Sequence, residues 1–110
     1  MGIRKHWIAF TKSPKGKIMV DRGAEKALLE NGKSLLPSGI IAVYDRFSPG
    51  DSVIIINKEE KRLAVGLVNY RSNDVERIMG HKSSDIESDL GYKYYDEVIH
   101  KDNLVITNEI

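Results

Sequence analysis

The sequence predicts a mainly β fold with short helices, an α+β pseudo-barrel of about six short strands. Apolar runs of strand type follow one another with few residues between them. The helical patterns are too short and too few to alternate with the strands, as they would in a doubly wound sheet. A helix also feeds through a Leu-Leu-Pro crossover into a strand within residues 23–47. We expect this passage to fix the placement of the rest of the chain.

Length and composition point to one domain that covers residues 1–110. The chain is 41% hydrophobic and 30% charged, which is typical of a folded globular protein. It has no cysteine, which excludes disulfides, thiolate zinc sites and thiol nucleophiles. A net charge of +1 gives no general signal for a polyanionic partner, so any basic surface must be local. No apolar run has the length of a membrane span, and we expect a cytoplasmic protein with no membrane partner.

The first half of the chain predicts three strands and one helix. Pro14 and Gly16 mark a turn between the first two strands, both apolar and rich in aromatic or β-branched residues. Asp21 has the side chain of a helix N-cap, and Gly32 is suited to end that helix in the left-handed conformation. The strands are expected at residues 7–10, 17–20 and 40–47, and the helix at residues 23–31.

The second half predicts three further strands and two short helices. Gly66 lies in the middle of a strand, which indicates a bulge, a bend or a close approach by another backbone. Ser72 or Asn73 is expected to cap one helix, and Ser84 with Glu87 has the spacing of a capping box for the next. The strands are expected at residues 52–57, 62–70 and 104–106, and the helices end at Gly80 and Gly91.

One group of residues could form a groove for an RNA backbone. A glycine in the first turn of the residue 23–31 helix would expose backbone N–H groups that attract phosphate. The alternative is that the glycine permits tight packing and the lysines are solvated. Aromatic side chains could also stack bases, or could simply cover the core. The groove would use Lys15, Lys17, Arg22, Gly23, Lys26, Lys33 and Ser34, and the aromatic candidates are Trp7, Tyr92, Tyr94 and Tyr95.

A metal site is not predicted from the histidines or the acidic residues. His6, His81 and His100 are far apart in sequence, so structural roles are favoured. We expect His81 to bond carbonyls at the end of a helix and His100 to brace a turn. Residues 85–89 include three carboxylates, but neighbouring positions point to different faces of a helix, and a solvated face is the better interpretation.

Several segments together identify a family resemblance. Residues 20–24 and 35–40 resemble the helix and crossover of PUA domains, small pseudo-barrels found on RNA-modifying enzymes. Five ordered blocks are similar to the C-terminal PUA domain of bacterial glutamate 5-kinases. Five blocks in register make this resemblance specific. The blocks are residues 4–9, 32–37, 66–70, 80–86 and 98–105.

The sequence departs from that family pattern at four positions. Ser38 stands where the family usually has alanine, and Arg71 where serine is common. Lys82 and Lys101 replace arginines. Lysine keeps the charge but lacks the forked geometry of the guanidinium group, so bidentate contacts are not expected at these positions.

The resemblance implies an accessory role. Glutamate 5-kinases phosphorylate glutamate with ATP at the start of proline synthesis, in a separate N-terminal amino-acid-kinase domain. This chain has no phosphate-binding loop motif. We therefore expect a non-catalytic PUA domain that modulates its partner kinase domain, with ATP and Mg²⁺ bound only in that parent domain and no cofactor here. The alternative is an RNA-binding module.

Overall fold

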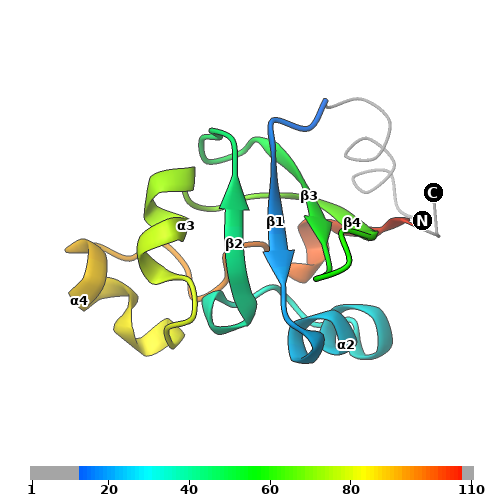
Figure 1. Cartoon of the computed structure of the whole chain (residues 1–110). Coiled ribbons are helices and arrows are strands. Elements are labelled where there is room, and N and C mark those ends of the chain that lie inside the picture. The colour runs from blue at the N-terminus through cyan, green and yellow to red at the C-terminus, as the bar shows by residue number, and fades with distance from the viewer. Residues whose placement is uncertain (1–12, 108–110) are drawn as a thin grey trace.

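The structure is a computed structural model that describes residues 13–107, and Figure 1 shows its arrangement. The described residues form one five-stranded sheet with helices at its margins, which confirms the predicted fold class. The first predicted strand, at residues 7–10, lies outside the described residues, as do His6 and Trp7. The strands are β1 (Gly16–Val20), β2 (Ile40–Tyr44), β3 (Ser52–Ile56), β4 (Arg62–Leu67) and β5 (Leu104–Ile106). The α-helices are α2 (Arg22–Asn31), α3 (Ser72–Ile78) and α4 (Ile86–Leu90), and single 3₁₀ turns cover Pro37–Gly39, Ser83–Asp85 and Lys101–Asn103.

The sheet is mixed, with the strand order β2-β1-β3-β4-β5. β1 pairs antiparallel with β2 on one side and parallel with β3 on the other. The remaining neighbours are antiparallel. The parallel pair arises because the chain leaves β1 through α2 and β2 before it returns as β3 on the opposite side of β1. β1 and β2 are therefore antiparallel neighbours that are connected through α2 and not through a tight hairpin turn.

A backbone bridge ties the crossover to the segment before β5 and partly closes the barrel. Leu35 donates its N–H to the carbonyl of Ile99, at 2.8 Å, and accepts a hydrogen bond from the N–H of Val98, also at 2.8 Å. Leu35, Val98 and Ile99 are all buried. The two ends of the sheet are thus joined through this bridge and not through a direct strand pair.

The core lies between the curved sheet and the helices. Ile18, Val53 and Ile55 are fully buried, and β3 is buried along its whole length, as predicted for its β-branched run. Gly66 permits a close approach, which was one of the predicted alternatives. A Cβ atom there would lie 2.7 Å from Ile99 Cγ2 and 3.1 Å from the carbonyl oxygen of Asn103. None of the helices within residues 13–107 is both long enough and apolar enough to cross a bilayer.

The β3–β4 hairpin is fastened to α2 by a buried side chain that the sequence did not single out. The side-chain oxygen of Asn57 accepts hydrogen bonds from the backbone N–H groups of Glu59 and Lys61, at 3.0 and 2.9 Å. Its amide nitrogen donates to the Glu25 carboxylate at 3.3 Å. Asn57 therefore shapes the turn and also holds it against the helix.

The ends of α2 agree with the prediction. The Asp21 carboxylate accepts a hydrogen bond from the Ala24 N–H at 2.8 Å, and Gly32 ends the helix with φ +57°. The side-chain oxygen satisfies one of the N–H groups that a helix start leaves without a backbone partner.

The predicted N-caps of the other two helices are wrong, although Gly91 ends α4 as predicted, in the left-handed conformation. Arg71 holds the N-cap position of α3 and makes no side-chain capping bond. Ser72 lies inside the helix, and its Oγ accepts a hydrogen bond from the Phe47 N–H at 3.3 Å, so this hydroxyl fastens a loop instead. Residues 83–85 form a 3₁₀ turn before α4, and Asp85 takes the N-cap position without a side-chain bond. That turn leaves no capping box between Ser84 and Glu87.

Candidate binding groove

A groove of about 600 Å³ lies on the α2 side of the domain. Three segments form its walls: the first half of α2, the crossover at residues 33–39, and the segment at residues 97–101. Figure 1 shows α2 and the crossover together at one end of the sheet. The lining residues are Asp21, Gly23, Ala24, Ala27, Lys33, Ser34, Leu35, Leu36, Ser38, Gly39, Glu97, His100 and Lys101.

Short contacts fix the walls of the groove. The Asp21 N–H donates to the Gly39 carbonyl at 2.9 Å. A Cβ atom on Gly39 would lie only 2.5 Å from the Ala24 Cβ, so a glycine is needed for the crossover to pack on α2. Across the groove, Ser34 Oγ accepts a hydrogen bond from the Lys101 N–H at 2.7 Å. Together with the Leu35–Ile99 bridge, these bonds hold the three segments in place.

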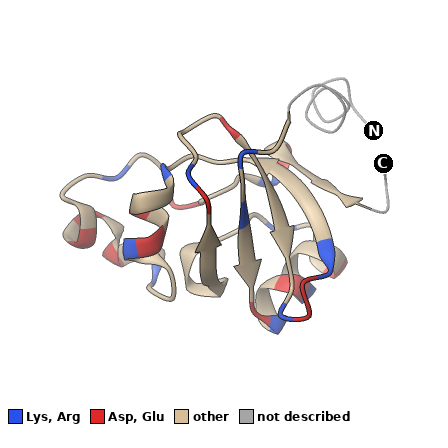
Figure 2. Ribbon diagram, turned by 45° about the horizontal axis from the view of Figure 1, so that its top comes forward, with Lys and Arg blue, Asp and Glu red and all other residues tan. Residues whose placement is uncertain are grey.

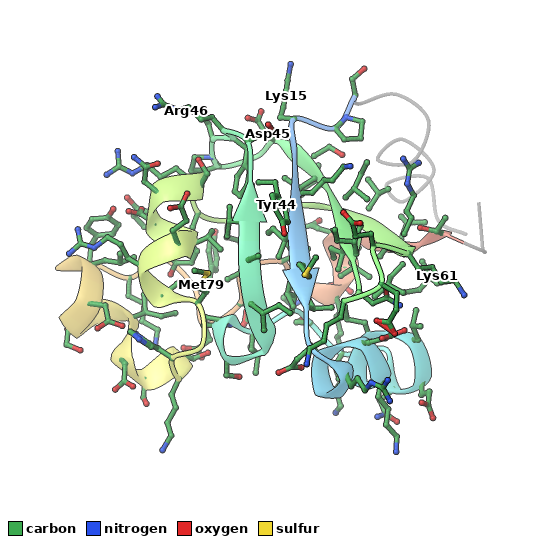
Figure 3. The ribbon with its side chains drawn as sticks, viewed as in Figure 1. Lys15, Tyr44, Asp45, Arg46, Lys61 and Met79 are labelled. Carbon is green, nitrogen blue, oxygen red and sulfur yellow. The ribbon has the colours of Figure 1, made fainter. Side chains whose placement is uncertain are left out.

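The structure brings together three of the seven residues predicted for an RNA groove. Gly23, Lys33 and Ser34 line this groove. Arg22 and Lys26 are exposed on α2 and lie outside the lining, and Lys17 is exposed on β1. Lys15 precedes β1 and points from the end of that strand opposite α2, as Figure 3 shows. A single groove does not contain all seven, and whether any of them contacts RNA remains a prediction.

Other lining residues were not predicted for this site. Ser38 and Lys101 were noted only as departures from a family pattern, and His100 only as a brace for a turn. The brace is confirmed, because His100 Nδ1 accepts a hydrogen bond from the Asp102 N–H at 3.0 Å. In the neutral ring the remaining proton is therefore on Nε2. Glu97 follows an acidic stretch of the sequence, but no local pattern predicted it for this groove, because only the fold brings it there.

The groove carries charges of both signs. Lys33 and Lys101 are opposed by Asp21 and Glu97, so the four charges cancel. Figure 2 shows the same mixture along α2, where acidic and basic residues are interspersed and no continuous basic stripe forms. The Asp21 carboxylate already binds the Ala24 N–H, which removes one donor that a phosphate could use at the start of the helix.

A second polar cluster surrounds Tyr70, which is fully buried. Its hydroxyl donates to the Tyr95 carbonyl at 2.5 Å and accepts hydrogen bonds from the N–H groups of Tyr94 and Tyr95, at 3.0 and 2.9 Å. The rings of Tyr70, Tyr94 and Tyr92 stack in succession, with centroids 5.4 and 5.1 Å apart. Tyr94 and Tyr95 are nevertheless 57% exposed. The tyrosine loop therefore covers part of the core while leaving two rings open to solvent.

A buried carboxylate joins this loop to α3. Asp74 is 3% exposed, and it accepts hydrogen bonds from the Tyr92 hydroxyl at 2.5 Å and from Arg71 Nε at 3.3 Å. The hydrogen bond to Asp74 raises the pKa of the Tyr92 phenol above its ordinary value, and it also raises the pKa of Arg71. This arrangement satisfies the buried charge and fixes the loop on the helix.

The prediction for the His81 ring is wrong. Its Nδ1 lies 2.7 Å from the Asp89 carboxylate rather than on a helix carbonyl, because α4 brings that carboxylate alongside the end of α3. Within residues 13–107 no group of three or more His, Asp or Glu side chains is placed to hold a metal ion.

The fold and this groove define a small α+β domain, and comparison with known proteins identifies its family. The PUA domain family matches residues 16–90, and the chain belongs to that family. Two solved PUA proteins share the fold. A PUA domain from Aeropyrum pernix K1, solved as a tartrate complex, has a TM-score of 0.57 at 24% identity and covers 78% of this chain and 41% of its own. A conserved PUA domain protein from Thermoplasma acidophilum has a TM-score of 0.54 at 22% identity, covering 86% and 53%.

Within the family, the chain is similar to the C-terminal region of glutamate 5-kinases. It is 52% identical over 103 residues to the enzyme of Thermoanaerobacter pseudethanolicus, covering 94% of this chain and 28% of the relative. It is 53% identical over 106 residues to the enzyme of Syntrophotalea carbinolica, covering 96% and 28%. The chain thus spans just over a quarter of the length of these relatives.

Proposed function

We propose that this chain is the C-terminal accessory domain of a glutamate 5-kinase, that it is not catalytic by itself, and that it modulates the kinase domain. The observation that carries the proposal is the 52% identity to the Thermoanaerobacter pseudethanolicus enzyme over 94% of this chain. Most of that relative lies outside the match, so glutamate phosphorylation, with its ATP and Mg²⁺, is assigned to the remainder. We place the parent protein in the cytoplasm, where ATP is available.

The exposed surface supports a protein partner. Leu29, Leu36, Ile41 and Tyr44 are each at least 40% exposed, and they lie on α2, the crossover and β2. Exposed apolar side chains of this kind can be buried against another protein surface, whereas RNA requires a basic track. The mixed charges of α2 in Figure 2 do not provide such a track.

The proposal predicts that the domain changes the kinetics of a kinase without performing the reaction. We would compare the Thermoanaerobacter pseudethanolicus enzyme as a full-length protein, without its C-terminal region, and with this chain in place of that region. Allosteric couplings of 1–3 kcal/mol correspond to changes of about 5- to 150-fold. Removal should therefore shift the apparent KM for glutamate or the response to an effector by at least about fivefold, and the chimera should restore most of that shift.

Two controls complete the comparison. The 110-residue chain alone should give no phosphate transfer to glutamate. Turnover by the chain alone would contradict the non-catalytic role. Identical kinetics for the truncated and full-length enzymes, with and without effectors, would contradict modulation.

RNA binding is the second candidate, because Lys33 and Lys101 lie on the same groove. The archaeal Nop10–Cbf5 complex of a box H/ACA sRNP shares the fold, with a TM-score of 0.51 at 23% identity, covering 55% of this chain and 19% of that one. If an electrostatic groove binds RNA, affinity for a structured RNA should fall steeply between 50 and 200 mM salt, by about tenfold or more for a few phosphate contacts. No binding at low salt, or binding that is insensitive to salt, would exclude this function.

A further inference from the structure

We propose that the groove is a binding site for a small zwitterion, namely a free α-amino acid with an apolar side chain. The proposal concerns this chain alone and holds whether or not a kinase domain is attached. It rests on three properties of the groove: the sign of its charges, the chemistry of its walls and its size.

The charges match a ligand that carries one charge of each sign. Lys33 and Lys101 can receive a carboxylate, and Asp21 or Glu97 can receive an ammonium group. Charge-assisted hydrogen bonds of this kind are stronger than neutral ones and give orientation. Ser34 and Ser38 add hydroxyl groups on the crossover side of the groove. A single amino acid can therefore satisfy both signs at once.

The walls between these charges are apolar and small. Ala24 and Ala27 present methyl groups from α2, and Gly23 and Gly39 add no side chain. Leu36 lines the opposite wall while 44% exposed. An apolar ligand side chain placed between α2 and Leu36 would remove this surface from water. The volume of about 600 Å³ lies within the range of about 300–1,000 Å³ that is usual for small-molecule sites.

Other ligand classes fit less well. A polyanion such as RNA would place phosphates near Asp21 and Glu97, and Asp21 already occupies the Ala24 N–H. A purely anionic small molecule would give Asp21 and Glu97 no counter-charge, and a purely cationic one would give Lys33 and Lys101 none. A neutral apolar ligand would cover the walls but would use none of the four charged groups.

The test is a titration of the isotopically labelled 110-residue chain with L-leucine, followed by amide chemical shifts. Saturable shifts are expected at the amides of Gly23, Ala24, residues 33–36, Ser38, Gly39, His100 and Lys101. Two analogues each lack one charge: 4-methylpentanoate has no ammonium group, and 3-methylbutylamine has no carboxylate. Each lost charge-assisted bond should weaken binding by about tenfold or more.

Variants locate the site on the protein. K101Q and E97Q should each weaken leucine binding by about tenfold, while K61Q, on the exposed β3–β4 turn, should leave it unchanged. Amide shifts away from the substitutions verify that each variant stays folded. The proposal is overturned if leucine gives no saturable shifts up to about 20 mM, in the weak-binding range for small ligands. Equal binding of either analogue, unchanged binding by both groove variants, or tighter binding of a structured RNA to the same amides would also overturn it.

Discussion

Replacing Gly66 by alanine is expected to lower the free energy of unfolding by about 2 kcal/mol, because the new methyl group has no room. It would lie 2.7 Å from Ile99 Cγ2 and 3.1 Å from the Asn103 carbonyl oxygen. Ile99 is fully buried and shares the backbone bridge with Leu35, so it cannot move aside without opening the closure of the barrel. Urea unfolding followed by intrinsic fluorescence would measure the loss.

The matched control is G23A. Gly23 lies in the first turn of α2. A Cβ atom there would lie 3.5 Å from Asp21 Oδ1, which is an ordinary van der Waals distance. Alanine favours helix more than glycine does, so G23A should be neutral or stabilising by up to about 1 kcal/mol. A G66A variant as stable as G23A would show that the segment before β5 does not pack on β4 as described.

The Y70F substitution removes a single oxygen atom, and it is expected to lower the free energy of unfolding by about 2–3 kcal/mol. The hydroxyl of Tyr70 makes three hydrogen bonds to the backbone of Tyr94 and Tyr95. Without it, two N–H groups and one carbonyl lose their partner beside a fully buried ring, and each orphaned group costs about 1–3 kcal/mol when water cannot replace the bond. Denaturant unfolding gives the stability change, and hydrogen exchange at the Tyr94 and Tyr95 amides reports the local effect.

Y44F serves as its control. Tyr44 lies on β2 with 42% of its surface exposed, so removal of its hydroxyl should change stability by less than about 0.5 kcal/mol. If Y70F were as mild as Y44F, or if the Tyr94 and Tyr95 amides exchanged no faster in Y70F, the hydroxyl of Tyr70 would not organise the loop.

Local patterns were sufficient to predict most of the elements. The β-branched run of β3 predicts a strand buried on both faces, and the structure confirms this. Asp21 and Gly32 bound α2 as expected, because N-cap and left-handed C-terminal positions depend on neighbouring residues alone. The N-caps of α3 and α4 were mispredicted. Ser72 bonds to the distant Phe47 N–H, and Ser84 lies in a 3₁₀ turn in which the neighbouring Ser83 bonds to the Asp96 carbonyl. Tertiary contacts overrode local propensity at these two helices.

The groove could be predicted only in part. Gly23, Lys33 and Ser34 come from two adjacent stretches, so sequence proximity was enough to group them. Glu97, His100 and Lys101 join them through the Leu35–Ile99 bridge, and no short-range pattern indicates that pairing. Lys15 and Lys17 were grouped with the others by sequence distance, but β1 carries Lys15 to the end of the strand away from α2. Two causes therefore divide the predicted residues: the direction of β1 separates Lys15 from the groove, and Arg22 and Lys26 lie on α2 outside the groove lining.

The bond between Ser34 and Lys101 joins positions 67 residues apart, and it has a consequence for biosynthesis. A ribosome releases the chain from its N-terminus, so α2 and the crossover emerge long before their partner segment. Until residues 97–107 leave the exit tunnel, the groove lacks the third of its three walls and the sheet lacks β5. Contacts of such long range also slow folding in general. We therefore expect this unit to complete its tertiary structure only after residues 97–107 have left the exit tunnel, long after α2 and the crossover have emerged.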